Sequence, residues 1–213
     1  MTNFDFLNKD PQFHTFASVA IAAEHLLHID PSSCVLNCRR AMEFAVKWMY
    51  SVDKGLEMPG RDSLLSLMNG ASFQEVVGPE IFERMEFIRK LGNLAAHSGE
   101  GISKEQAELC LENLFIFLDQ IAYFYAENYQ SQRFDRSLLD LTVEEALSFV
   151  PNSEHKEQQY KEASDDLTQR RMAHQPSFVP KPLDLSKDEA RKIYLDILMQ
   201  EAGWCEGLDW LIE

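Results

Sequence analysis

Residues 103–129 read SKEQAELCLENLFIFLDQIAYFYAENY, and this stretch decides the fold. Ser103 and Gln106 have the spacing of a capping box, in which each side chain bonds the other residue's backbone N–H at a helix start. From Ala107 to about Tyr129 the segment is rich in Leu, Phe and Tyr. At this length it predicts a long central helix against which other helices pack.

The residues before this stretch carry the signals of further helices. Asp10-Pro11 and Asp30-Pro31 each place a capping side chain before a proline at the first helical position. Apolar residues at i, i+3 and i+4 follow both starts, and the same period recurs after Gly78-Pro79. The sequence therefore predicts an all-α antiparallel bundle of about five helices within residues 1–130, with helices over 11–27, 31–54, 64–69, 79–97 and 104–129.

The composition changes after residue 130. Residues 131–185 form a polar connector that contains Pro176, Pro180 and Pro182. Thr142 and Glu145 predict one short helix in it that ends near Phe149. We expect residues 150–185 to be partly helical and the most loosely packed part of the chain. Residues 186–213 begin with a second Ser/Glu capping box and predict an amphipathic helix with Ile193, Tyr194 and Ile197 on its apolar face. The chain stops with no closing signal, so we expect a fragment of a longer protein.

Charge and composition exclude several classes of protein. The 213 residues include 35 Asp+Glu and 20 Lys+Arg, for a net charge of -15. Residues 1–130 and residues 131–213 are both acidic, so neither part has the basic surface of a nonspecific DNA binder. No apolar run could cross a membrane, and the N-terminus lacks a secretory signal. Four cysteines in such a chain predict reduced thiols and a cytoplasmic location.

Three polar residues of the helix expected over 79–97 are candidate functional residues. Arg89, Asn93 and His97 lie four residues apart and therefore form one ridge on a helix. An arginine can hold a phosphate or a developing negative charge, and a histidine can transfer a proton near neutral pH. The small residues beside the ridge, Gly92 among them, would let another helix approach closely. The alternative is structural: Arg89 pairs with a carboxylate, while Asn93 and His97 bond backbone or a neighbouring helix.

Other possible sites are weaker. His25, His28, Cys34 and Cys38 could converge, but their spacing matches no known structural zinc site, and we expect no metal here. No glycine-rich nucleotide loop is present, so we expect no cofactor in this chain. The Glu154-His155-Lys156 run has the E-x-K pattern of some nucleases but lies in a polar segment rather than a buried strand.

Two segments resemble known families. Residues 13–125, with CRRAME at 38–43 and IRKLGNLAAH at 88–97, resemble an uncharacterised helical domain family of bacteria that is related to the HEPN bundles. Residues 189–204 resemble the start of the nuclease domain of type I restriction enzyme R (HsdR) subunits. Together, and in this order, they resemble the N-terminus of an R subunit of a restriction-modification system.

The resemblance implies a parent protein with a metal-dependent endonuclease and an ATP-driven DNA translocase of the helicase class. That parent would be a type I site-specific deoxyribonuclease subunit that uses ATP and Mg²⁺ and joins methylation and specificity subunits. Its nuclease residues would lie beyond Glu213, so we expect this chain alone to be a noncatalytic helical module that contacts protein or nucleic acid.

Two alternatives remain open. Many HEPN proteins are ribonucleases that use an Arg and a His four to six residues apart. Here seven residues separate Arg89 from His97, so this chain departs from that pattern. HEPN relatives also often pair their ridges across a dimer, so a homodimer is a further expectation. The second alternative is a structural bundle that only buries surface against the rest of its own chain.

Overall fold

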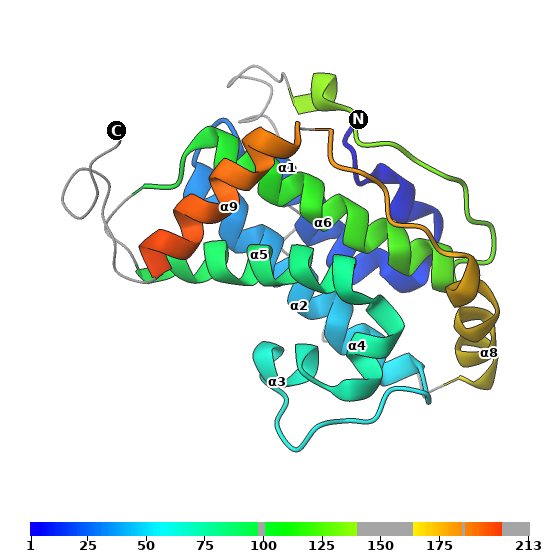
Figure 1. The fold of residues 1–213 in the computed structure, drawn as a ribbon. Helices are drawn as coiled ribbons and strands as arrows, with labels where there is room; N and C mark the ends of the chain where they lie inside the picture. Colours follow the sequence, from blue (N-terminus) through cyan, green and yellow to red (C-terminus); the bar gives the residue numbers. More distant parts are fainter. Residues whose placement is uncertain (98–100, 140–163, 185, 202–213) are drawn as a thin grey trace.

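The computed structural model describes residues 1–97, 101–139, 164–184 and 186–201 (Figure 1). Within these ranges every regular element is a helix, and no strand is present. The predicted all-α class is therefore confirmed.

Four long helices form the bundle: α1 (His14–Leu26), α2 (Pro31–Val52), α5 (Pro79–His97) and α6 (Lys104–Tyr125). α2 packs against α1, α5 and α6, and α5 also packs along α6. The middle of α6 is surrounded on all sides, because every residue from 109 to 122 is buried. α6 is thus the central helix that its apolar sequence predicts.

The predicted helix starts are confirmed at the level of hydrogen bonds. The Asp30 side chain accepts from the Ser32 N–H at the start of α2. Both bonds of the capping box between Ser103 and Gln106 are made at the start of α6. Ser186 and Glu189 also bond each other's backbone N–H groups, at 3.2 and 3.3 Å. These helix starts could be predicted from the sequence because the capping residue lies within a few residues of the N–H groups that it bonds. Those N–H groups have no hydrogen-bond partner within the helix itself.

The region between α2 and α5 contains one helix more than the sequence indicates. α3 (Leu64–Met68) is the predicted short helix, but α4 (Ala71–Val77) follows it after only two residues. Phe73 of α4 stacks on Tyr50 of α2 with ring centroids 5.7 Å apart. Contact with α2 thus stabilises a seven-residue helix that is too short to be stable alone.

Residues 164–184, the described part of the segment expected to be loosely packed, contact the bundle, but Arg171 is the single buried residue in this range. α8 (Asp165–His174) packs against α6, and α9 (Lys187–Glu201) packs against α5. In Figure 1 α8 is the gold helix beside the bundle, and α9 is the orange helix lying across the region of α5 and α6. The helix expected to end near Phe149, and the E-x-K run at 154–156, lie outside the described residues.

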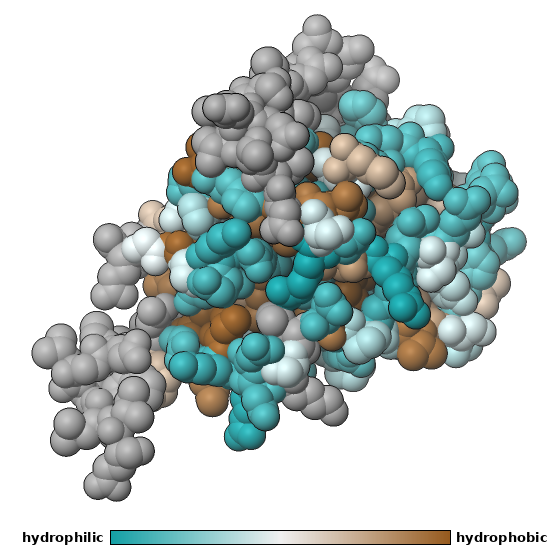
Figure 2. All heavy atoms as spheres, turned by 90° about the horizontal axis from the view of Figure 1, so that it is seen from above, coloured by the Kyte–Doolittle hydropathy of each residue, from teal (hydrophilic) through white to brown (hydrophobic). Residues whose placement is uncertain are grey.

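The described surface is mainly hydrophilic on the face drawn in Figure 2, with apolar residues visible between the polar ones. Among the described residues no helix is both long and apolar enough to cross a membrane.

Candidate functional site

The predicted ridge lies on the C-terminal half of α5. Arg89 makes a two-pronged ion pair with Glu86 on the same helix: Nε donates to Oε1 at 2.9 Å and Nη2 donates to Oε2 at 3.0 Å. The Arg89 side chain is only 15% exposed. The two bonds fix the plane of the guanidinium. They agree with the structural alternative for Arg89, in which this residue pairs with a carboxylate.

Asn93 and His97 continue the ridge toward the C-terminal end of α5. Asn93 is half-buried and follows Arg89 by about one helical turn. His97 is the last residue of α5, but its side chain lies outside the described residues. The structure therefore brings Arg89 and Asn93 onto one partly exposed face and leaves the role of His97 as a prediction.

The close helix approach expected at the small residues is found at Gly92. A Cβ atom placed on Gly92 would lie 2.5 Å from Cδ and 2.9 Å from Cβ of Arg39. The carbon chain of Arg39 from α2 therefore lies directly on the glycine, one residue from Asn93. Any side chain larger than hydrogen at this position would push α2 and α5 apart.

Arg39 is a residue of the candidate site that the sequence of α5 alone does not reveal. It is half-buried, and no hydrogen bond or ion pair joins its guanidinium to another described residue. Its neighbours on α2 are already engaged: Arg40 lies 5.3 Å from the centre of the Phe44 ring, and Glu43 pairs with Lys47 at 2.6 Å. The sequence shows the Arg39-Arg40 pair, but it does not show that Arg39 contacts α5, because that contact joins residues far apart in the chain.

The cysteines and histidines considered for metal are dispersed. Cys38 is within hydrogen-bonding contact of Cys34 and Cys110 inside the core, and burial raises the pKa of both the Cys34 and Cys38 thiols. His28 instead bonds the Leu139 carbonyl oxygen. Among the described residues no three His, Cys, Asp or Glu side chains are arranged to hold a metal ion.

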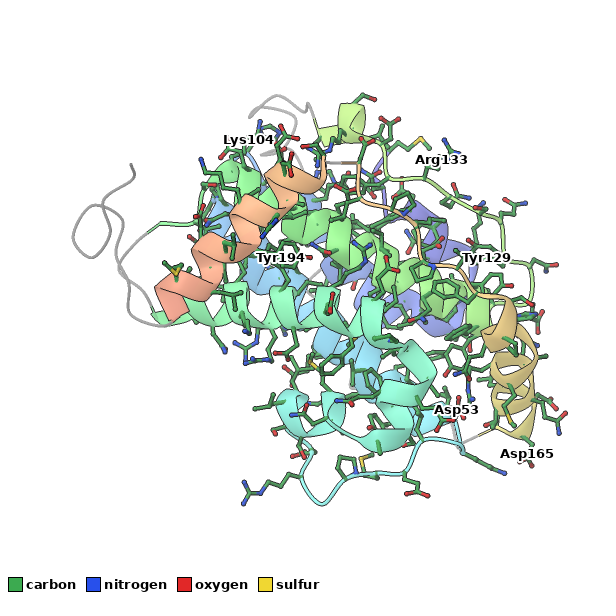
Figure 3. The ribbon with its side chains drawn as sticks, in the orientation of Figure 1. Asp53, Lys104, Tyr129, Arg133, Asp165 and Tyr194 are labelled. Carbon is green, nitrogen blue, oxygen red and sulfur yellow. The ribbon has the colours of Figure 1, made fainter. Side chains whose placement is uncertain are left out.

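A buried ion pair joins α8 to the end of α2. Arg171 donates from Nε to Asp53 Oδ2 at 2.8 Å and from Nη2 to Oδ1 at 3.2 Å. Tyr125 and the Gly55 N–H also donate to this carboxylate, each at 2.8 Å. Burial by itself raises the pKa of Asp53, but these hydrogen bonds outweigh it and lower that pKa. Figure 3 shows Asp53 beside α8.

A second charged contact holds the segment between α8 and α9. Lys181 Nζ lies 2.8 Å from Asp119 Oδ2 and 3.3 Å from the Tyr129 hydroxyl. The same ammonium is 5.8 Å from the Phe115 ring centre. Burial keeps the pKa of Asp119 above its ordinary value despite the lysine. Asp119 is on α6, so this contact ties residues after α8 to the centre of the bundle.

One cavity of the described structure lies away from the ridge. It has a volume of about 650 Å³ and is bounded by Lys9, Gln12, Tyr129 and Arg170 among others. Its cations already have partners, because Lys9 donates to Gln130 and Arg170 to the Tyr125 carbonyl oxygen. Its mixed charges point to no ligand class, so the Arg39–Asn93 surface remains the candidate site.

The candidate site lies inside a recognised family domain. Residues 22–147 match the family described as Domain of unknown function (DUF4145). The chain belongs to this family. The match confirms the resemblance to an uncharacterised helical domain, and it includes the two quoted segments, 38–43 and 88–97. No curated protein and no solved structure shows a significant match to the chain.

The fold brings the two quoted segments of this DUF4145 domain together. Arg39 lies in the first segment and Gly92 in the second, and they are in direct contact. Residues 164–201 lie beyond the matched range and pack onto the domain from outside it.

Proposed function

We propose that this chain is the noncatalytic helical head of a type I restriction R subunit, and that it mediates contacts within the restriction complex. Nuclease and ATP-driven translocase activities would belong to downstream parts of the parent protein. Methylation and specificity subunits would be its partners.

One observation carries this proposal. α9, whose sequence resembles the start of an R-subunit nuclease domain, is docked on the DUF4145 domain. Ile197 of α9 is 1% exposed, and the Tyr194 ring lies 4.4 Å from that of Phe87 on α5 (Figure 3). Residues following α9 would therefore start from a fixed position on the bundle, as expected for a module that orients its neighbours.

The ribonuclease alternative has less support from the geometry. A catalytic arginine must reach the phosphate of a bound RNA, but Arg89 is largely buried and bonded to Glu86 through two nitrogens. Releasing it would leave the Glu86 carboxylate without this partner, which disfavours the exchange.

The proposal is tested by assembly and by activity. We expect the purified chain to co-elute with the methylation and specificity subunits of its own system in size-exclusion chromatography. We also expect it to leave plasmid DNA, ATP and structured RNA unchanged in the presence of Mg²⁺. RNA cleavage by the parent chain that is abolished in His97→Ala would overturn the noncatalytic proposal and establish the alternative.

A further inference from the structure

Residues 178–184, which we call the strap, connect the end of η4 (Gln175–Ser177) after α8 to the start of α9 and lie along α6, in orange in Figure 1. Every residue of the strap is exposed or half-buried. The polar side chains of α6 beside it, Glu112, Asp119 and Gln120, are each 1% exposed. A stripe of polar side chains on the central helix is therefore covered by a segment that has no buried residue of its own.

This stripe includes a site for an ammonium group. Lys181 Nζ of the strap lies 2.8 Å from Asp119 Oδ2. The same nitrogen is 5.8 Å from the centre of the Phe115 ring and 6.0 Å from that of Tyr129, and it donates to the Gln132 carbonyl oxygen. A carboxylate, a carbonyl oxygen and aromatic rings all attract an alkylammonium ion. The residues that form this site lie within the DUF4145 range, whereas Lys181 lies outside it.

The bundle also bonds the backbone of the strap. Arg84 Nη2 donates to the Lys181 carbonyl oxygen at 3.2 Å. The Asp184 N–H donates to Glu112 Oε1. The ring centre of Phe178 lies 5.4 and 5.5 Å from those of two aromatic residues of α6. Grooves that bind extended peptides combine such backbone bonds with sites for particular side chains, so the strap is held as a bound peptide would be.

The strap leaves several polar atoms of this groove without hydrogen bonds. Among the described residues, Arg84 Nε and Gln120 Oε1 are buried and have no hydrogen-bond partner. Arg136 Nε is also buried, and its distance of 3.6 Å from Asp184 Oδ2 is too long for a hydrogen bond. Buried polar atoms of native proteins nearly all have partners. The groove therefore offers more hydrogen bonding than the strap uses.

The strap also leaves part of the groove unfilled. A cavity of about 330 Å³ is bounded by Pro180 of the strap and by Gln120 of α6. Glu75 and Glu80 border it from the end of α4 and the start of α5. Glu80 pairs with Arg84 at 2.8 Å, whereas the Glu75 carboxylate makes no ion pair with another described residue. A positively charged side chain with N–H donors would suit both the Gln120 carbonyl oxygen and Glu75.

We propose that this groove binds an extended basic segment of a partner protein, and that the strap occupies it as an imperfect internal ligand. The favoured segment has an aromatic residue at the position of Phe178, a basic residue at that of Pro180 and a lysine at that of Lys181. The lysine enters the Asp119 site, and the basic residue before it fills the cavity beside Gln120. The net charge of -15 favours a basic partner over an acidic one.

The inference does not depend on the proposed R-subunit identity, because it concerns only the strap and the groove under it. Peptide binding with failed subunit assembly would leave this site standing while removing the proposed function. Subunit assembly without peptide binding would do the reverse.

Binding is measured by fluorescence anisotropy with a labelled synthetic peptide of residues 175–186 and with the same peptide carrying Pro180→Arg. The host is the full chain with Lys181→Met, which removes the ammonium that holds the strap but keeps most of the side-chain length. We expect the Pro180→Arg peptide to bind this host at least ten times more tightly than the unchanged peptide. Replacing the lysine of the Pro180→Arg peptide by methionine should weaken its binding at least tenfold.

Val179→Ser is the matched control host, because Val179 is 79% exposed on the same strap. Its strap should stay in the groove at a high effective concentration, so both peptides should bind it much more weakly than they bind Lys181→Met. Phe178→Ser is a second test host, since it loosens the strap without altering the Asp119 site, and it should show the same preference for the Pro180→Arg peptide. Equal binding of the two peptides to both test hosts, or binding of neither, overturns the proposal.

Glu75→Gln, added to the Lys181→Met host, locates the bound peptide. It should weaken binding of the Pro180→Arg peptide by about threefold, as expected for loss of an exposed ion pair, and leave the unchanged peptide unaffected. Glu57→Gln is the control, because it removes the same charge from an exposed residue in the loop before α3. An equal effect of the two variants would reflect general charge alone and would contradict a site at this cavity.

Discussion

Glu24 on α1 is a carboxylate that the fold almost completely removes from water. Its exposed fraction is 1%, and its oxygens accept the Asn3 backbone N–H at 3.0 and 3.1 Å. Burial raises the pKa of Glu24 to about 7, and the bonds from Asn3 only partly oppose this effect. The folded state therefore binds a proton here that the unfolded chain releases near pH 4.5.

The stability of the protein should consequently depend on pH through Glu24. Glu24 contributes most to the free energy of unfolding below pH 4.5. This contribution declines as the pH rises toward 7, because only the folded state keeps the proton in that interval. The difference amounts to about 3 kcal/mol. We expect Glu24→Gln to raise the free energy of unfolding at pH 8 by a large part of this amount and to have little effect at pH 4.5.

Denaturant unfolding of the parent and of Glu24→Gln over pH 4.5 to 8 measures this difference. Subtracting the two profiles removes the contribution of other titrating groups. A difference that does not change with pH would show that Glu24 does not titrate as described.

Asp53 and Arg171 form the buried pair whose loss should be most costly. Arg171→Met leaves the Asp53 carboxylate, itself 0% exposed, with only the Tyr125 hydroxyl and the Gly55 N–H as partners. Removing one member of such a pair costs about 3 kcal/mol. Lys54→Met is the control, because the Lys54–Asp165 pair is exposed and should be worth less than about 1 kcal/mol. Similar melting temperatures for both variants would contradict this account.

At the scale of elements, α9 is held to the bundle by one face only. Ile197 is 1% exposed, whereas Leu195, two residues earlier on the same helix, is 48% exposed. We expect Ile197→Ser to loosen α9 and to speed tryptic cleavage after the exposed residues Arg191 and Lys192, since cleavage follows local opening. Leu195→Ser should leave the rate near that of the parent. Equal acceleration in both variants would mean that docking does not depend on the buried face.

At the scale of the whole molecule, the charge distribution limits what can bind. With a net charge of -15 the chain should not retard long duplex DNA in a gel at physiological salt, because too few counterions would be released. Retardation that weakens steeply with added salt would show that a basic surface has been overlooked.

Much of the architecture was readable from local sequence. Asp30, Ser103 and Ser186 all cap the helices that they predict, because capping depends on residues within one turn. The apolar sequence of α6 likewise predicts its central place. α4 escaped prediction because its seven residues depend on Tyr50 of α2, and no local pattern contains that contact.

The chain by itself determined the helical class, the starts of the main helices and the Arg89–Asn93 ridge, since all of these depend on neighbours along one helix. Tertiary structure alone placed Arg39 on Gly92, which are 53 residues apart in the sequence. It also decided that residues 164–184 pack on the bundle. Their few apolar residues predicted loose packing, and most of them are indeed exposed or half-buried. The sequence did not reveal that Arg171 pairs with a buried carboxylate at the end of α2, or that Lys181 pairs with one on α6. A charged side chain in water contributes little to the docking of a segment, whereas the same side chain beside a buried opposite charge contributes much. The fold alone determines which of these two environments a given charge has.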